Sequence, residues 1–252
     1  MAKTNQAHTS YHNIYSQYSL DKITDIAQKS MTGRTHAKAS LKDPVSAITH
    51  MIGAAMAAIG TFPLVGKAVL SGSITAAAAM SIFMASMILL YTASSVYHSI
   101  DYSDKCTLLL RRIDHSMIFV LIAGSYTPVC LLVLPASRGI PLLIAVWSIA
   151  CLGIFLKIWL IRCPKWVSSV IYIMMGWLCV LVFGPLIHSL TREGFAWLLA
   201  GGLIYTIGGI IYGVKPKIFQ RLPRGFGNHE IFHLFVMGGS FCHYIFMYRC
   251  VL

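Results

Sequence analysis

Long apolar segments alternate with short polar connections from about residue 44 to the C-terminus. A helix that spans the hydrocarbon core of a membrane needs about 20 predominantly apolar residues. Seven segments reach this length, and no repeat or second domain interrupts them. The pattern therefore predicts an all-α membrane protein, a seven-transmembrane helix bundle over residues 43–252. We expect the spanning helices near residues 44–69, 73–99, 113–135, 139–161, 166–188, 195–214 and 229–252.

The composition agrees with this class and separates residues 1–42 from the rest of the chain. The chain is 57% hydrophobic and only 11% charged, whereas soluble domains contain about 25% charged residues. Residues 1–42 are polar and basic, and they lack the apolar region of a signal peptide. We expect them to form a flexible cytoplasmic tail.

Positive charges alternate between the two ends of the expected helices. Counted from the tail to the C-terminus, the successive connecting segments contain 6, 1, 3, 1, 3, 1, 4 and 1 Lys or Arg residues. Because cytoplasmic segments carry the excess of these residues, the series predicts a cytoplasmic N-terminus and a C-terminus outside. The protein is then integral to the cell (inner) membrane as a multi-pass protein. This topology and attraction to anionic lipids explain the net charge of +12, so we expect no nucleic-acid partner.

The seven cysteines show no C-x-x-C pair. Most lie inside apolar segments, where a cysteine behaves as a small hydrophobic residue. We therefore expect neither a disulfide framework nor a thiolate metal site.

The segment HEIFH, residues 229–233, matches the H-E-x-x-H motif of zinc proteases. On a helix its two histidines lie about 40° apart around the axis and about 6 Å apart along it, so both can bind one ion. Proteases with this motif take a third ligand further downstream. No carboxylate follows Glu230, and His243 lies about 15 Å further along the same helix. The protease interpretation therefore fails, and the third ligand must come from upstream.

Several expected helices place ionisable residues at one depth, near their cytoplasmic ends. A catalytic zinc has three protein ligands and one open position, and His98, His229 and His233 supply three. Asp114, expected in the first turn of its helix, would take a proton from the attacking water, whose pKa a metal lowers to about 7. The polar residues that converge in this way are His50, Ser94, His98, Asp114, His229 and His233.

Each of these residues also has a structural interpretation. The histidines of residues 229–233 could lie among lipid headgroups, and His98 could face the C-terminal dipole of its helix. Asp114 could be a first-turn carboxylate paired with Arg111 or Arg112. Their shared depth favours a metal site over these separate roles.

Three further polar residues near the expected site have their own alternatives. Ser94 could simply allow two helices to approach closely. His50 could be either a hydrogen-bond partner of the site or a packing residue. For Glu230 we expect a first-turn acid that the helix dipole stabilises, because it points about 100° away from His229.

Six segments from about residue 43 to the end form a recognisable set, in this order: DPVSAITHMIGA, SSVYHSID, RRIDHSMIFVLIAGSYTP, IYIMMGWL, GGLIYTIGGIIYG and NHEIFHLFVMGGSFCHY. On these segments the sequence resembles the hemolysin III proteins, the bacterial branch of the progestin and adipoQ receptor superfamily. One departure is in the first motif, where Asp43 and Ser46 stand in place of the Glu and Asn usual in that family.

The resemblance implies a seven-helix membrane protein with a Zn²⁺ ion held by three histidines on the cytoplasmic side. Carried onto this chain, the ligands are His98, His229 and His233, with Asp114 and Ser94 beside the attacking water. The wider superfamily includes membrane hydrolases that cut lipid amides, ceramide among them.

Three functions remain open. The first is a zinc-dependent hydrolase that acts on an amide or ester of a membrane lipid, with the metal and Ser94 stabilising the oxyanion. The second is a pore-forming cytolysin, which the apolar outer halves of the expected helices disfavour. The third is a sensor or receptor with a structural zinc ion. The sequence carries no signal for the oligomeric state.

Overall fold

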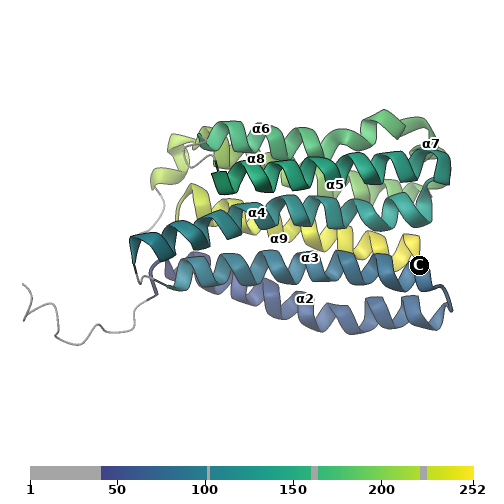
Figure 1. The fold of residues 1–252 in the computed structure, drawn as a ribbon, viewed down its shortest axis with the longest axis horizontal. Coiled ribbons are helices and arrows are strands. Elements are labelled where there is room, and N and C mark those ends of the chain that lie inside the picture. Colours follow the sequence, from purple (N-terminus) through teal and green to yellow (C-terminus); the bar gives the residue numbers. More distant parts are fainter. Residues whose placement is uncertain (1–40, 101–102, 160–163, 222–225) are drawn as a thin grey trace, which may run out of the picture. The chain divides into compact units, whose positions relative to one another are not determined.

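The computed structural model describes residues 41–100, 103–159, 164–221 and 226–252, and this part contains helices but no strand. The segment expected to form a tail, residues 1–42, lies outside the described residues apart from its last two. Figure 1 shows the helices running roughly parallel along one axis. They are α2 (Pro44–Leu70), α3 (Ile74–Ser99), α4 (Asp104–Pro128), α5 (Ala136–Trp159), α6 (Lys165–Gly176), α7 (Phe183–Ser189), α8 (Arg192–Val214) and α9 (Asn228–Phe246).

Seven helical segments of the described part are long and apolar enough to cross a membrane. Three of them include a tighter or wider helical turn, because α4 continues into η1 (Val129–Val133), α6 reaches α7 through η2 (Trp177–Val182), and α9 continues into η4 (Met247–Val251). Large apolar side chains such as Ile59, Phe62 and Leu181 point outward, as expected for a surface in contact with lipid. The predicted seven-helix membrane bundle is thereby confirmed.

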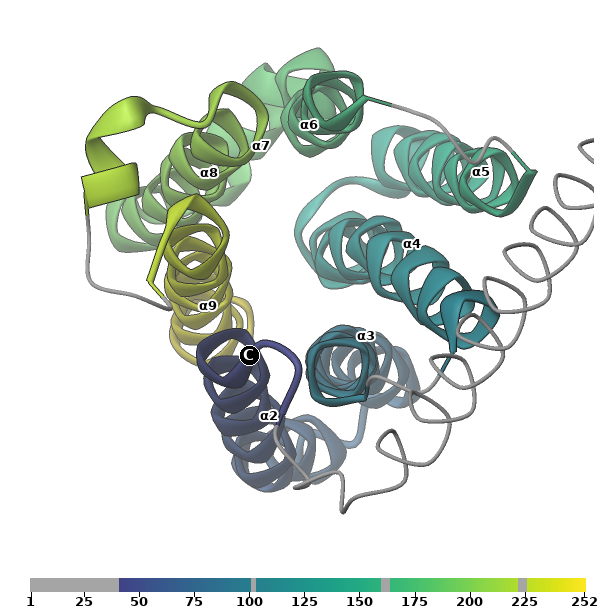
Figure 2. The same cartoon turned by 90° about the vertical axis from the view of Figure 1, so that its left-hand side faces the viewer.

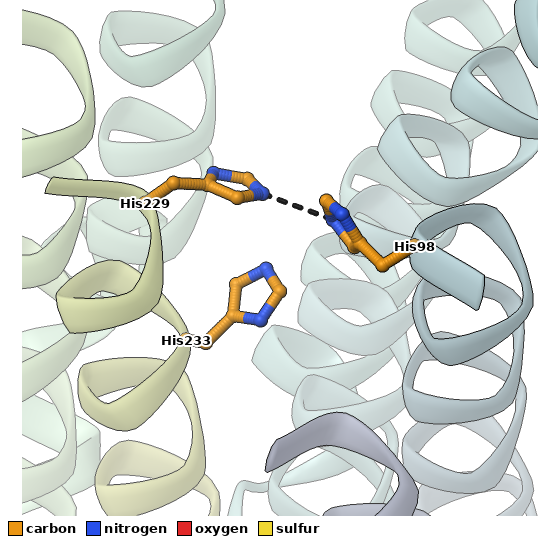
Figure 3. A group of neighbouring side chains, drawn as sticks. All are labelled: His98, His229 and His233. Carbon is orange, nitrogen blue, oxygen red and sulfur yellow. Dashed lines mark hydrogen bonds between the residues drawn. The ribbon is translucent and has the colours of Figure 1, made fainter. Parts of the chain in front are cut away.

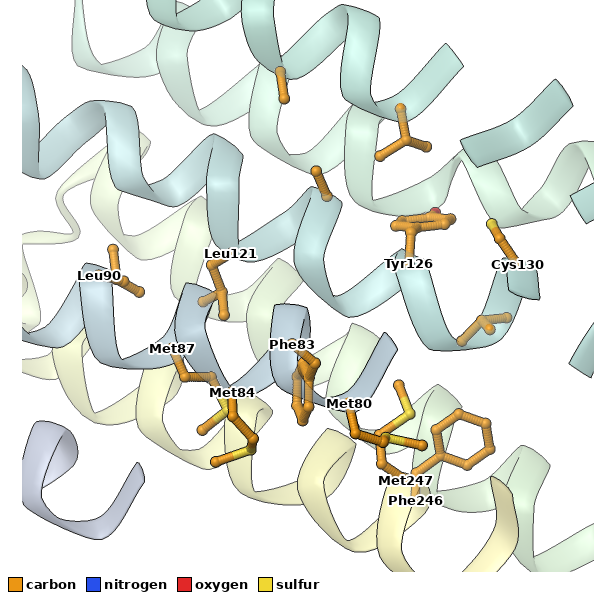
Figure 4. Close-up of a cluster of buried hydrophobic side chains, with 14 of the residues drawn as sticks. Met80, Phe83, Met84, Met87, Leu90, Leu121, Tyr126, Cys130, Phe246 and Met247 are labelled. Carbon is orange, nitrogen blue, oxygen red and sulfur yellow. The ribbon is translucent and has the colours of Figure 1, made fainter. Parts of the chain in front are cut away.

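The helices follow one another around a ring in chain order, and α9 closes the ring between α8 and α2 (Figure 2). Inside it, a hydrophobic core joins α3, α4 and α9, and Figure 4 shows side chains of α3 beside Phe246 and Met247. Helices α3 and α4 approach each other closely at Gly124, where an added Cβ would overlap the Ser86 side chain. Because α2 packs against both α3 and α9, and α3 packs against α4, residues near their ends are held in fixed relative positions.

A polar link crosses this core between three helices. The Tyr91 hydroxyl of α3 donates to Ser240 Oγ of α9 at 2.7 Å, and the Tyr205 hydroxyl of α8 lies 2.8 Å from the same oxygen. Ser240 and Tyr91 are buried. The link fixes the position of α9 about two turns beyond His233.

The third spanning helix begins earlier than the apolar pattern predicts, at Asp104 rather than near residue 113. The Ser103 hydroxyl accepts the Cys106 N–H and caps the helix, so the polar residues that follow continue the helix beyond the apolar segment. Asp114 consequently lies in the third turn of α4. Its predicted place in the first turn was wrong.

The fifth spanning segment is interrupted, although the pattern near residues 166–188 predicts one continuous helix. The Tyr126 hydroxyl of α4 donates to the Gly176 carbonyl at 2.6 Å and accepts the Cys179 N–H at 2.9 Å. A side chain inserted into the helical hydrogen-bond ladder satisfies the groups that the break releases. Tyr126 therefore compensates for the break between α6 and α7.

We expect Tyr126→Phe to destabilise the bundle by about 1–2 kcal/mol, because it leaves the Gly176 carbonyl and the Cys179 N–H without partners inside a membrane-spanning segment. Thermal unfolding of the purified protein in detergent measures the effect. Tyr248→Phe is the matched control, since the Tyr248 ring is more exposed than that of Tyr126, and its segment η4 contacts η1 at the same end of the bundle. Equal melting temperatures for the two variants would contradict the role of Tyr126.

Candidate metal site

Three histidines converge at the end of the bundle where α3 ends and α9 begins, which we call the cluster end. His98 lies in the last turn of α3, and His229 and His233 lie in the first two turns of α9. One ring nitrogen from each lies within 4.8 Å of the others. Figure 3 shows the three rings facing a common point, with the Nε2 atoms of His98 and His229 only 3.0 Å apart.

Asp43 orients the first of these histidines. Its Oδ2 lies 2.9 Å from His98 Nδ1, and its backbone N–H donates to the His98 carbonyl, also at 2.9 Å. A carboxylate on one imidazole nitrogen holds the proton there and leaves a lone pair on the other nitrogen. His98 Nε2 is therefore prepared to act as a ligand. The resemblance compared Asp43 with a family glutamate, and the fold brings it to His98, 55 residues away.

The ring of His233 is held by two neighbours on α2. It stacks on His50, with 3.6 Å between ring centroids and 10° between planes, and its Nδ1 lies 3.5 Å from Thr49 Oγ1. His50 also meets Tyr91 edge-on. The two nitrogens of His50 have no hydrogen-bond partner among the described residues, so His50 supports the site by packing.

Asp114 on α4 and Ser94 on α3 line the same cavity as His229 and His233. Both are buried, and the carboxylate is close enough to the Ser94 hydroxyl to interact with it, although that hydroxyl lacks a partner at full hydrogen-bond geometry. In the described part of the chain Asp114 forms no ion pair with Arg111 or Arg112. It also stands outside the group of converging ligand atoms. Asp114 is therefore not one of the candidate metal ligands.

The Glu230 carboxylate forms hydrogen bonds at the start of α9. Its Oε2 accepts the Gly227 N–H at 2.8 Å, and its Oε1 accepts the Ser46 hydroxyl of α2 at 2.7 Å. This capping arrangement confirms the prediction of a helix-start acid. Ser46, which replaces the asparagine usual in the family, therefore links α2 to α9 through Glu230.

The cluster lies between two spaces. One is an internal cavity of mainly apolar lining, which has Ser94, Asp114 and His233 at the cluster end and reaches Leu186 near the opposite end. The other is a polar vestibule at the cluster end, lined in part by His98. His229 borders both spaces. A molecule with one polar and one apolar part could therefore meet the histidines at the junction.

The cysteines of the described residues are all free. Cys163 lies outside the described residues. The histidines are therefore the metal-ligand candidates at this end of the bundle.

Comparison with known proteins gives consistent matches over most of the chain. A sequence family described as "Haemolysin-III related" matches residues 39–244, a range that includes every candidate site residue. The chain is 40% identical to "Hemolysin-3" of Bacillus cereus over 207 residues, which cover 82% of this chain and 89% of the relative. It is 39% identical to "Hemolysin-3 homolog" of Bacillus subtilis (strain 168) over 214 residues, or 84% and 94% of the two chains.

Proposed function

The chain belongs to the haemolysin III family of multi-pass membrane proteins, and from that premise we propose that it is a zinc-dependent hydrolase of a membrane-lipid amide or ester. The observation that carries the proposal is the convergence of three imidazoles beside a buried acid and hydroxyl, at the mouth of an apolar cavity. The bond to be cut would lie at the cluster, and the acyl chain would occupy the cavity.

The donor set fits zinc. Three neutral imidazoles and one open position are the ligand set of a catalytic Zn²⁺ site, and among the described residues no fourth histidine, cysteine or carboxylate joins the group. The contact of Asp43 with His98 is the carboxylate–histidine arrangement that commonly orients zinc ligands. His98, His229 and His233 would hold the ion.

When bound, the metal supplies a Lewis acid that polarises the carbonyl and makes water more acidic. The Asp114 carboxylate accepts a proton from the attacking water and delivers it to the leaving nitrogen or oxygen. The Ser94 hydroxyl donates a hydrogen bond to the carbonyl oxygen as it gains negative charge. The water oxygen joins the acyl carbon, the C–N or C–O bond breaks, and a fatty acid and an amine or alcohol leave.

We place the cluster end on the cytoplasmic face of the cell (inner) membrane. The alternation of Lys and Arg along the sequence supports this orientation, because the cation-rich tail precedes α2 at this end. On this proposal the substrate enters from the cytoplasmic leaflet.

The two relatives are named hemolysins, which raises cytolysis as a second activity. We attribute any such effect of this chain to lipid hydrolysis rather than to a pore. An aqueous pore needs a polar lining through the whole membrane, and the internal cavity has a mainly apolar lining.

The decisive experiment measures metal content and lipid turnover on one preparation. Purified protein should contain about one zinc ion per chain and release fatty acid from N-acyl or O-acyl lipids, as followed by mass spectrometry. Chelation should abolish release, and added zinc should restore it. A zinc-loaded protein that hydrolyses none of these lipids would contradict the proposal and favour a sensor with a structural ion.

A further inference from the structure

Four cationic side chains line the vestibule at the cluster end. Arg111 and Arg112 come from α4, Lys157 from the last turn of α5 and Lys165 from the start of α6. Figure 2 looks onto this end of the bundle and shows the ends of these helices opposite the start of α9. Three helices therefore direct positive charge into one concave space.

The acids in the same space offset these cations only in part, because two carboxylates, Asp43 and Glu230, face four cationic side chains. Asp43 is bound to His98, and both oxygens of Glu230 are used by Ser46 and by the Gly227 backbone. In the described part of the chain, none of Arg111, Arg112 and Lys165 forms an ion pair with a carboxylate. Like charges this close repel one another, so the vestibule favours an anion from outside the protein.

Arg112 supplies a second, independent observation. Its Nε is buried and has no hydrogen-bond partner among the described residues. A buried donor without a partner is costly, and for a charged group the cost is higher. A guanidinium presents a planar fork of donors that matches the oxygens of a phosphate. Arg112 therefore lines the vestibule with a buried donor whose hydrogen bond a phosphate oxygen would satisfy.

The general excess of cations on one membrane face explains charges on the outer rim, which contact surrounding headgroups. It does not explain charges that line a concavity shared with the metal-site histidines. His98 and His229 border the vestibule, so an anion held there would lie next to the cluster. The apolar cavity begins on the other side of His229.

We propose that the vestibule binds the phosphate of a lipid headgroup, with Arg112 and Arg111 as its principal ligands. The substrate of the hydrolase proposed above, on which this second step rests, is then an acyl lipid that carries a phosphate near the bond to be cut. Lys157 and Lys165 add positive charge, Lys165 lying 5.0 Å over the ring of Tyr212. The acyl chain extends into the internal cavity while the phosphate stays in the vestibule.

Binding can be tested without turnover. The probes are dioctanoyl phosphatidic acid, dioctanoylglycerol with the same chains but no phosphate, and inorganic phosphate, each titrated against the full-length protein in neutral detergent. We expect phosphatidic acid to bind at least about tenfold more tightly than the diacylglycerol, since one hydrogen bond to a charged group accounts for that factor. Equal binding of the two lipids would overturn the proposal.

The variant is Arg111→Gln/Arg112→Gln, and the control is Arg138→Gln, which removes an exposed charge from α5 at the opposite end of the bundle. The double variant should lose the preference for phosphatidic acid while keeping its melting temperature and metal content, and the control should keep the preference. An unchanged preference in the double variant overturns the site. Inorganic phosphate that binds as tightly as phosphatidic acid supports an anion site and overturns its assignment to a lipid.

Different experimental results would overturn the hydrolase and the phosphate site. Hydrolysis of neutral acyl lipids together with equal binding of the two probes overturns the phosphate site alone. A phosphate preference that depends on the two arginines, in a protein that hydrolyses no lipid, supports the phosphate site and overturns the hydrolase.

Discussion

Replacing His233 by alanine should remove the metal from the protein, and we expect the same result for His98→Ala. Loss of a residue that only supports a metal ligand already weakens binding by about 10–100-fold, and loss of a ligand itself should weaken it further. Both side chains are buried, and one ring nitrogen of each belongs to the converging group. Metal analysis of the purified variants, after dialysis against a weak chelator, measures the effect.

His243→Ala is the matched control for this loss. His243 lies on α9 like His233 and is also buried, but it stands outside the converging group. It should keep the zinc content of the unchanged protein. If His98→Ala and His233→Ala also kept it, the three-histidine site would be wrong.

The second large effect that we expect concerns Asp114, the proposed acceptor of the proton from the attacking water. Asp114→Asn keeps the size of the side chain and removes the group that accepts the proton, so kcat for lipid hydrolysis should fall by about 10²–10⁴-fold. Metal content should stay unchanged, because Asp114 lies beside the converging atoms rather than among them. The release of fatty acid over time, measured at saturating lipid, gives kcat directly.

Glu230→Gln tests the competing assignment of the base. In a protease with H-E-x-x-H the glutamate is the base, but here both oxygens of Glu230 are engaged in hydrogen bonds at the start of α9. We therefore expect Glu230→Gln to change kcat by no more than a few-fold, because glutamine retains an acceptor oxygen. A large loss in Glu230→Gln combined with a small loss in Asp114→Asn would return the base to Glu230.

The sequence supports the membrane bundle because the length of an apolar segment is itself the requirement for crossing a membrane. The gathering of His98 with His229 and His233 follows from the order of the helices, since alternate connections lie at the same end. The start of α4 could not be predicted from the length of the apolar segment. The helix extends beyond that segment into polar residues, and Ser103 caps it there.

Contacts between distant segments could not be predicted from the local sequence pattern. Tyr126 compensates for the break between α6 and α7 from 50 residues away, and no feature of residues 166–188 identifies that partner. The stacking of His50 on His233 depends in the same way on α2 packing against α9. For Asp43 a signal did exist, since it immediately precedes the first span at the depth expected for His98.

Asp43 connects the preceding segment of the chain to the candidate site. The residue that orients His98 is also the one through which residues 1–42 join the membrane domain. A pull on that segment, or a binding event that shifts it, reaches the imidazole through one residue and two hydrogen bonds. An affinity tag or truncation placed next to residue 43 should therefore disturb the orientation of the His98 imidazole.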